Sequence, residues 1–378
     1  MKVTLAFDSF KGSLSSQEVA EAFESGLRSC APECEVAKIV IADGGEGTTE
    51  ALVEALHGEY VDAVVSDPLG RPITTRYGIV DNGSTAIIEM AKASGLPLLH
   101  PCERNPLQTS TYGTGEMIAD ALKRGCRHFL IGIGGSATND GGMGMLSALG
   151  YQFLDKQGNR LKGNGASLLD VASIDDSQIL PAVREAHFTV ACDVTNPLYG
   201  ENGAAYVFAR QKGADTSMVE QLDRGLRNYA QIIKEYNNND IASLPGAGAA
   251  GGLGAGFCAL LNAHLVPGIE MILDAIKFDR IIADSSLIVT GEGCIDYQTL
   301  MGKTPSGVLK RASQHNIPVV AIGGKVVWCD ALRDSNFAAI LPITYDDIPI
   351  EEAMKPHIAQ ENVKKTAIYI ANKYLLGE

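Results

Sequence analysis

Short apolar runs rich in β-branched residues recur along the chain, and a polar loop containing glycine follows most of them. Each such loop leads into a stretch whose apolar residues recur at helical spacing. Strands that feed helices in this way are typical of a parallel sheet covered by helices on both faces. We predict one such sheet from six runs, residues 3–7, 36–41, 129–133, 287–289, 319–322 and 338–341.

Two intervening stretches have a different pattern. Residues 60–65, 73–80 and 85–90 are short β-rich segments, and the Asn82-Gly83 step is a strong hairpin signal. Such a meander does not continue a parallel sheet, and the pattern after residue 151 is again irregular. The fold class we expect is therefore α/β, with a parallel Rossmann-like three-layer sheet domain and a second α/β lobe formed by insertions. We assign residues 1–58, 107–150 and 284–378 to the Rossmann-like domain, and 59–106 and 151–283 to the inserted lobe.

The composition is that of a globular protein, and it excludes some partners. Of the 378 residues, 46% are hydrophobic and 20% are charged. The net charge of −14 argues against a nucleic-acid surface, which needs a basic footprint. No apolar run has the length of a membrane span, and the N-terminus lacks the pattern of a signal peptide.

The eight cysteines form neither a C-x-x-C pair nor a Cys/His cluster of zinc spacing. Reduced thiols in the cytoplasm are the simplest explanation of this pattern. We therefore expect a cytoplasmic protein with no membrane or nucleic-acid partner. The sequence leaves open whether the chain is a homo-oligomer.

Residues 290–308, TGEGCIDYQTLMGKTPSGV, concentrate chemical groups directly after an apolar strand. Open α/β folds bind ligands at this place, outside the carboxyl ends of the strands. The candidate groups are Gly291, Glu292, Gly293, Asp296, Lys303 and Thr304. An ordinary strand-to-helix loop is the alternative, but carboxylates, a lysine and hydroxyls beside glycines favour a phosphate and metal site. The Gly-Lys-Thr step is not a P-loop, because position 297 is Tyr and not the glycine that this motif requires.

Two further loops repeat this design. The loop after residue 41 places Asp43 and Glu46 beside glycines, and acidic loops at neighbouring strand ends suit Mg²⁺. A single carboxylate in such a loop is more often a cap or a solvated charge. The loop after residue 133 is rich in glycine and also contains a hydroxyl and an amide; its candidates are Gly134, Gly135, Ser136 and Asn139. Because residues 132–137 match G-x-G-x-x-A, a dinucleotide site or a plain tight turn are alternatives there.

Two other strand ends carry groups that suit catalysis. Lys11 lies between Ser9 and Ser13 after the first strand. A lysine beside hydroxyls and glycines at a strand end binds an anion more often than a lysine in an ordinary loop does. Asp193 ends a predicted strand and is a candidate general base, with a turn cap as the alternative. No G-x-S-x-G elbow is present, and no histidine accompanies a nucleophile, so serine hydrolase chemistry is not indicated.

With these residues in view, the chain resembles the bacterial glycerate kinase family, the type that includes enzymes of the glyoxylate and glucarate pathways. The resemblance covers nearly the whole chain. The motifs that carry it are residues 8–13 (DSFKGS), 42–48 (ADGGEGT), 67–72 (DPLGRP), 134–142 (GGSATNDGG), 290–293 (TGEG), 296–299 (DYQT) and 302–305 (GKTP). The family implies a two-domain α/β kinase that transfers the γ-phosphoryl group of ATP to D-glycerate with Mg²⁺.

Chemistry then suggests a role for each candidate residue. We expect the nucleotide phosphates at Gly134, Gly135, Ser136, Asn139, Gly291, Glu292, Gly293, Lys303 and Thr304. We expect Mg²⁺ at Asp43, Glu46 and Asp296, and D-glycerate at Ser9, Lys11, Ser13 and Arg71. Asp193 would accept the proton of the attacking hydroxyl, and it forms the expected catalytic pair with Lys11. A cleft between the lobes would close to exclude water.

Two other functions stay open at this point. The chain could be an oxidoreductase that uses residues 132–137 for a nucleotide cofactor and acts on a small hydroxy acid. It could also be a two-lobed protein that binds a small anion without catalysis. For a kinase, the sequence does not decide between 2-phosphoglycerate and 3-phosphoglycerate as the product.

Overall fold

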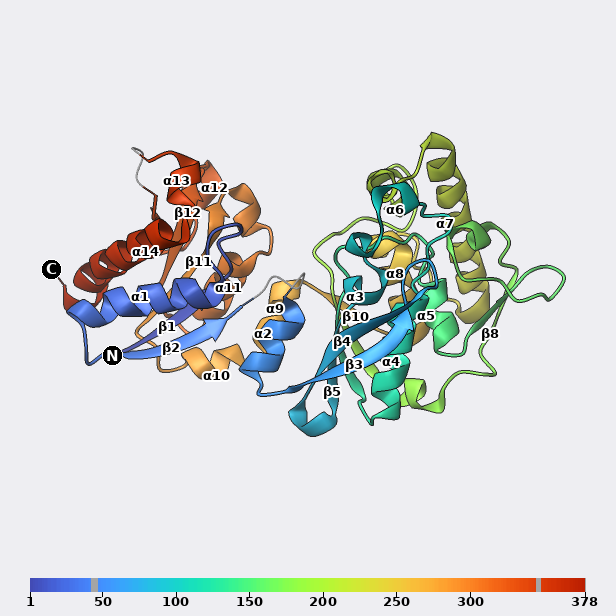
Figure 1. The fold of residues 1–378 in the computed structure, drawn as a ribbon, viewed down its shortest axis with the longest axis horizontal. Coiled ribbons are helices and arrows are strands. Elements are labelled where there is room, and N and C mark those ends of the chain that lie inside the picture. Colours follow the sequence, from blue (N-terminus) through green and yellow to red (C-terminus); the bar gives the residue numbers. More distant parts are fainter. Residues whose placement is uncertain (42–46, 345–347, 378) are drawn as a thin grey trace. The chain divides into compact units, whose positions relative to one another are not determined.

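The structure is a computed structural model, and it describes residues 1–41, 47–344 and 348–377. Contacts divide the chain into two compact units (Figure 1). Unit 1 comprises Met1–Asp43 and Ile272–Glu378, and unit 2 comprises Gly44–Met271. Both ends of the chain therefore belong to unit 1, while unit 2 is one continuous segment.

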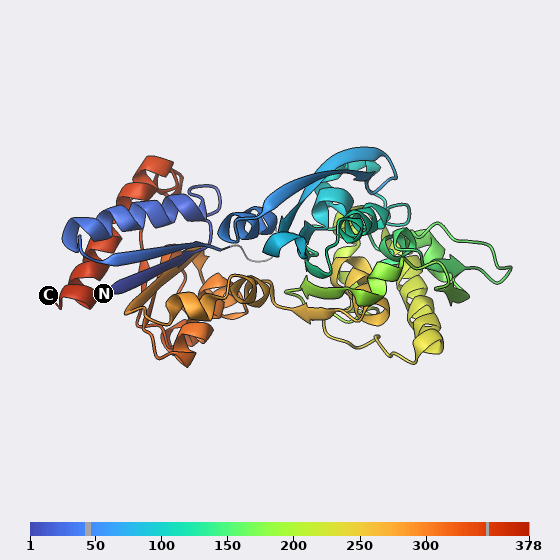
Figure 2. The same cartoon turned by 90° about the horizontal axis from the view of Figure 1, so that it is seen from below.

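Unit 1 contains a five-stranded parallel sheet with the strand order β13-β12-β11-β1-β2. Its strands are β1 (Lys2–Phe7), β2 (Glu35–Val40), β11 (Leu287–Ile295), β12 (Val319–Val326) and β13 (Ala339–Pro342). Its helices are α1 (Ser16–Cys30), α10 (Phe278–Ile282), α11 (Thr304–Gln314), α12 (Asp330–Arg333), α13 (Ile350–Ala353) and α14 (Pro356–Ala371). Figure 2 shows the sheet between α1 and α14 on one face and α10 and α11 on the other.

Local sequence explains where α1 begins and which face it buries. The Ser15 hydroxyl accepts a hydrogen bond from the Glu18 N–H, and the Glu18 carboxylate accepts one from the Ser15 N–H. This capping box satisfies two N–H groups that a helix start leaves unpaired. The apolar residues Val19, Phe23 and Leu27 then lie on one side of the helix and enter the core of unit 1.

Unit 2 contains a six-stranded mixed sheet with the order β10-β9-β6-β5-β4-β3. Its strands are β3 (Glu59–Ser66), β4 (Pro72–Val80), β5 (Thr85–Glu89), β6 (His128–Gly132), β9 (His187–Ala191) and β10 (His264–Val266). The first three are antiparallel neighbours, and Asn82 and Gly83 lie in the turn between β4 and β5, so the predicted hairpin is confirmed. The remaining neighbours pair in parallel.

The other elements of unit 2 surround this sheet. A separate two-stranded ribbon pairs β7 (Gln152–Leu154) with β8 (Ser173–Asp175). The helices are α2 (Thr48–Ala55), α3 (Ala91–Ser94), α4 (Tyr112–Lys123), α5 (Met143–Ala148), α6 (Ala204–Phe208), α7 (Thr216–Asn237) and α8 (Ala249–Leu261). Helix α9 (Gly268–Ala275) spans the boundary between the units. Each unit has a hydrophobic core of its own.

The α/β fold class with mostly parallel sheets is confirmed, but one predicted strand belongs elsewhere. Strand β6, predicted as residues 129–133 of the Rossmann-like sheet, pairs with β5 and β9 in unit 2. Accordingly, residues 107–150 lie in unit 2 and not with the N-terminal strands. The pattern of strand, loop and helix identifies a parallel strand but does not encode which sheet it joins. Within the described residues, no helix is both long and apolar enough to cross a membrane.

Candidate functional site

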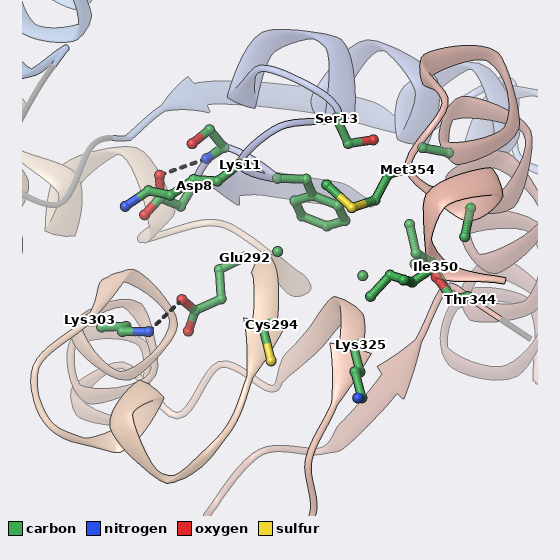
Figure 3. A pocket seen from close by; sticks show the side chains of 17 residues that line it. Asp8, Lys11, Ser13, Glu292, Cys294, Lys303, Lys325, Thr344, Ile350 and Met354 are labelled. Carbon is green, nitrogen blue, oxygen red and sulfur yellow. Dashed lines mark hydrogen bonds and ion pairs between the residues drawn. The ribbon is translucent and has the colours of Figure 1, made fainter. Parts of the chain in front are cut away.

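A cavity of about 300 Å³ opens in unit 1 where β1, β11 and β12 end (Figure 3). Its polar side chains come from the loop after β1, from the end of β11 and from the end of β12. The charged residues that line it are Asp8, Lys11, Glu292, Lys303 and Lys325. The carboxyl ends of parallel strands are where open α/β sheets bind ligands, as the sequence predicts.

The two carboxylates of this cavity hold parts of its wall in place. Glu292 accepts a hydrogen bond of 2.6 Å from the Thr299 hydroxyl and lies 3.2 Å from the Lys303 ammonium. Asp8 accepts hydrogen bonds from the Ser9 N–H at 2.6 Å and from the Thr304 hydroxyl at 3.4 Å. Lys303 is thereby oriented by a carboxylate of a neighbouring strand, and Figure 3 shows this pair at the edge of the cavity.

The opposite side of the cavity is apolar. Phe10, Ile343, Ile350, Met354 and Ala359 line it, partly from α13 and the start of α14. Ile350 and Met354 are 53% and 39% exposed, so the apolar wall faces open space. A pocket with cations on one side and apolar surface on the other suits a ligand that has a charged part and an apolar part, such as a nucleotide with its phosphates and its base.

Six residues predicted for phosphate or substrate binding meet in this cavity: Ser9, Lys11, Ser13, Glu292, Gly293 and Lys303. The predicted Gly291 and Thr304 lie behind it. A Cβ at Gly291 would be 2.2 Å from the Ile322 carbonyl oxygen, so this glycine is required by the packing of β11 on β12. Lys325 also lines the cavity, and no role was predicted for it from the sequence. It follows two glycines near the end of a strand, and Lys303 likewise follows a glycine.

The three predicted metal ligands differ in what the structure describes of them. Asp43 and Glu46 lie outside the described residues. Asp296 accepts a hydrogen bond from the Gln298 N–H and caps the short helix at Tyr297–Leu300. Among the described residues, no group of three or more His, Cys, Asp or Glu side chains could hold a metal ion. Mg²⁺ bound with phosphates needs only one or two carboxylates, and Asp8 and Glu292 at the cavity fit that requirement.

The glycine-rich loop after β6 surrounds a buried lysine of unit 2. Lys212 is 2% exposed, and its ammonium donates to the Ser136 hydroxyl at 2.6 Å and to the Thr138 carbonyl at 2.7 Å. Burial lowers the pKa of Lys212 to about 7, and nearby Asp140 opposes this shift. Sequence reasoning missed Lys212, which stands in a polar stretch, Arg-Gln-Lys-Gly, that gives no sign of burial.

Asp140 has a structural task in the same loop. It is fully buried and accepts hydrogen bonds from the N–H and hydroxyl of Thr111 at 2.7 and 2.8 Å. It also accepts from the N–H groups of Gly142 and Gly144 at 3.1 and 3.3 Å. Burial raises the pKa of Asp140, while these hydrogen bonds act against the rise. The residue ties the loop to the start of α4 and α5.

The two remaining predicted residues are engaged in other contacts. Arg71 lies 2.5 Å from the Asp67 carboxylate and 2.6 Å from that of Glu103, and both raise its pKa. A guanidinium bound by two carboxylates is poorly placed to take up a substrate carboxylate. Asp193 is exposed and accepts a hydrogen bond of 2.9 Å from the Gly268 N–H at the start of α9. Arg71, Asp193, Gly134, Gly135, Ser136 and Asn139 belong to unit 2, and the other described candidates belong to unit 1.

Comparison with known proteins identifies the family. The model of the glycerate kinase family matches residues 3–375. A glycerate kinase of Bacillus cereus is 47% identical over 372 residues, which cover 98% of this chain and 97% of that protein. A glycerate 2-kinase of Escherichia coli K12 is 46% identical over 378 residues, with 100% and 99% covered.

A solved structure agrees with these sequence matches. The crystal structure of a protein assigned as glycerate kinase 2 from Salmonella typhimurium LT2 superimposes with a TM-score of 0.90. It is 45% identical and covers 100% of this chain and 99% of its own. The chain therefore belongs to the glycerate kinase family.

Proposed function

We propose that this glycerate kinase family member transfers the γ-phosphoryl group of ATP to a hydroxyl of D-glycerate. The observation that carries the proposal is the cavity of unit 1, which combines three lysines, two carboxylates and an apolar wall at the strand ends. Phosphoryl transfer depends mainly on positioning and on neutralising phosphate charge, and these groups can do both.

The nucleotide occupies the unit 1 cavity in this proposal. Its base contacts the apolar wall at Ile350 and Met354, and its phosphates meet Lys11, Lys303 and Lys325. The three ammonium groups can neutralise part of the charge of a triphosphate, although Glu292 already pairs with one of them, Lys303. This changes the expected role of Lys11, from the glycerate carboxylate to the phosphate chain.

The carboxylates of the cavity fit a magnesium ion that accompanies the nucleotide. Mg²⁺ bound to the phosphates would neutralise part of their charge, and Asp8 and Glu292 are the residues that would hold it. Asp43 and Glu46 stay predicted ligands. Asp296 is a weaker candidate because its carboxylate already caps a helix.

The reaction itself requires one proton acceptor from the chain. The hydroxyl oxygen of glycerate attacks the γ-phosphorus, the bond from that phosphorus to the ADP oxygen breaks, and the hydroxyl proton leaves to a base. Asp193 stays the predicted base; it is exposed, and its carboxylate accepts a hydrogen bond from the Gly268 N–H. The closing cleft and the cytoplasmic location also stay predictions, and whether the chain is a homo-oligomer stays open.

The product we propose is 2-phosphoglycerate. A relative that is 46% identical over the whole chain is named a glycerate 2-kinase, and this name favours the 2-hydroxyl as the acceptor. Proton and phosphorus NMR of the product distinguish 2-phosphoglycerate from 3-phosphoglycerate directly. A product phosphorylated only at the 3-position would contradict this part of the proposal.

Coupled ADP release tests the function and separates it from the alternatives. We expect ADP release to require both ATP and D-glycerate. A nicotinamide absorbance change with a hydroxy acid would instead indicate an oxidoreductase, and glycerate binding without ADP would indicate a binding protein. The substitutions Lys303→Met and Lys325→Met should each raise the KM for ATP by about tenfold or more, the effect of losing a charged hydrogen bond.

The matched control is Lys365→Met, which removes the same charge from an exposed position on α14. It should leave both KM values unchanged. An unchanged KM for ATP in both cavity variants would place the nucleotide outside this cavity, even if the protein phosphorylates glycerate.

A further inference from the structure

A buried polar cluster in unit 2 contains a lysine to which the proposed nucleotide site gives no role. Lys212 ends a short helix, Arg210–Lys212, and its ammonium makes two hydrogen bonds, to Ser136 and to the Thr138 carbonyl. An ammonium has three N–H donors, so one of them has no partner among the described residues. Lys212 also makes no ion pair with any described carboxylate, although it is almost completely buried.

Other buried polar atoms without partners belong to Thr138, whose carbonyl accepts from Lys212, and to its neighbour Asn139. Asn139 and Thr138 are fully buried, and neither the amide oxygen and nitrogen of Asn139 nor the hydroxyl of Thr138 has a hydrogen-bond partner in the described chain. The hydroxyl of Tyr229, whose ring packs against Gly141, also has no hydrogen-bond partner among the described residues. Buried polar groups in folded proteins nearly always have partners, so we expect water or a polar group of a ligand to bind these atoms in the working protein.

The ammonium of Lys212 is the group of this cluster that could bind an anion. Asp140 is the carboxylate that influences the pKa of Lys212, but its oxygens already accept hydrogen bonds from Thr111, Gly142 and Gly144. Asp140 therefore compensates the ammonium only in part, and because an incompletely compensated buried charge is costly, a bound anion would lower that cost. Gly134 and Gly135 are exposed and directly precede Ser136, so solvent lies within a few residues of the cluster.

The backbone around the cluster is fixed by close packing. The first turn of α8 has positive φ angles at Ala250, Gly251 and Gly252, where an L side chain is disfavoured. A Cβ at Gly251 would lie 2.1 Å from the Thr138 oxygen and 2.5 Å from the Asn139 Cα. This turn therefore supports Thr138 and Asn139 from behind, which positions their side chains before a ligand arrives.

We propose that Lys212, Asn139 and Thr138 form the subsite that binds the carboxylate of the phosphoryl acceptor, a small 2-hydroxy acid. One ammonium matches one carboxylate, whereas the several charges of a triphosphate match the three lysines of unit 1. The Asn139 amide can donate to the second carboxylate oxygen and accept from the neighbouring hydroxyl. This proposal rests on the proposed kinase function. It assigns Ser136 and Asn139, which were predicted to bind the nucleotide phosphates, to the binding of the phosphoryl acceptor.

The decisive measurement compares the KM for D-glycerate with the KM for ATP. Lys212→Met removes the charge, and Asn139→Asp keeps the size of the side chain but repels a carboxylate. Both should raise the KM for D-glycerate at least about tenfold, as expected for a lost charge-assisted hydrogen bond, and leave the KM for ATP within about twofold. Lys212→Arg should recover part of the loss. The control Lys234→Met removes an exposed lysine of α7 and should change neither value.

Other outcomes of these kinetics overturn the proposal. An unchanged KM for D-glycerate in both variants would exclude the subsite. A raised KM for ATP with an unchanged KM for D-glycerate would assign the cluster to nucleotide phosphate. Equal loss for both substrates, without recovery in Lys212→Arg, would show that the cluster only maintains the fold.

Calorimetry on the unmodified protein keeps the proposal testable if the variants fail to fold. D-glycerate binding at pH 8 should take up about one proton, because a neutral lysine must become charged to hold the carboxylate. Asp140 is the titratable group whose charge acts on Lys212, and it is buried, as is Tyr229, on which Asp140 also acts. Binding without proton uptake would show that Lys212 does not change its protonation when D-glycerate binds, and the KM values of Lys212→Met and Lys212→Arg would then decide whether it contacts the carboxylate. Uptake with D-glycerate in a protein that releases no ADP would support the subsite and refute the kinase function.

Discussion

Lysine side chains of this protein differ in their chemistry because of what surrounds the ammonium, not because of their local sequence. Lys303 stands beside glycine and threonine after a strand, a pattern that predicted a phosphate site, and the structure places it at the edge of the unit 1 cavity. Lys212 stands in a stretch that resembles any solvated loop, yet it is buried against Ser136 and Thr138. Burial is produced by segments distant in sequence, and a local pattern cannot report it.

The stability of the protein should depend on pH through Lys212. Burial lowers its pKa to about 7 in the folded protein, from the ordinary value of 10.5 in the unfolded chain. Between these values the unfolded chain binds more protons than the folded one, so the free energy of unfolding rises with pH in this window. In urea titrations from pH 7 to 9, Lys212→Met should remove a slope of at most about 1.4 kcal/mol per pH unit.

Two hydrogen bonds are also lost in Lys212→Met, but their loss is the same at every pH and does not alter the slope. The exposed control Lys234→Met should keep the slope of the unmodified protein. Parallel pH profiles for the unmodified protein and Lys212→Met would mean that the buried ammonium keeps its ordinary pKa.

At the scale of elements, the packing of α1 on α14 combines a predictable part with an unpredictable one. The apolar face of α1 at Val19, Phe23 and Leu27 follows from helical spacing. The closeness of the two helices depends on Gly26, because a Cβ there would lie 2.5 Å from the Lys364 carbonyl oxygen. A glycine within a helical pattern gives no indication of which helix approaches it.

Gly26→Ala should therefore destabilise unit 1 although alanine favours helix formation. The added methyl group would also lie 2.9 Å from the Ala367 Cβ, so α14 must move away. We expect a loss of about 1–3 kcal/mol in the free energy of unfolding, measured in urea, as for an overpacked core. Ser25→Ala, at the neighbouring exposed position, should be neutral or slightly stabilising. A Gly26→Ala variant as stable as Ser25→Ala would show that the helices are less tightly packed.

At the scale of the whole molecule, the chain is organised as one continuous unit inserted into another. Unit 2 runs from Gly44 to Met271 and contains a complete six-stranded sheet and its own hydrophobic core. Unit 1 is completed only when its N-terminal segment pairs with its second segment, since β1 lies beside β11. A unit with its own core can in principle fold alone.

Residues 44–271 should consequently fold as an independent fragment. We expect cooperative unfolding in urea, followed by circular dichroism, because the sheet and the core of unit 2 need no residue from unit 1. A fragment of residues 151–283, cut at a boundary predicted from sequence, is the control. It should not fold, because β9 loses its neighbour β6. A non-cooperative 44–271 fragment would mean that unit 2 depends on unit 1.

The sequence by itself determined the fold class, most of the strands, the hairpin at Asn82-Gly83 and the polar loops at the strand ends. These features follow from local rules, namely residue periodicity, turn chemistry and helix capping. It also placed Ser9, Lys11, Glu292 and Lys303 in candidate loops that the structure joins in one cavity.

Only the tertiary structure decided which sheet β6 joins, that Lys212 is buried and that Arg71 is already bound by two carboxylates. It also supplied the apolar wall at Ile350 and Met354. The physical reason is common to all four. Each of these features depends on contacts between segments that are far apart in the chain. The energy of such contacts cannot be read from the local pattern of residues.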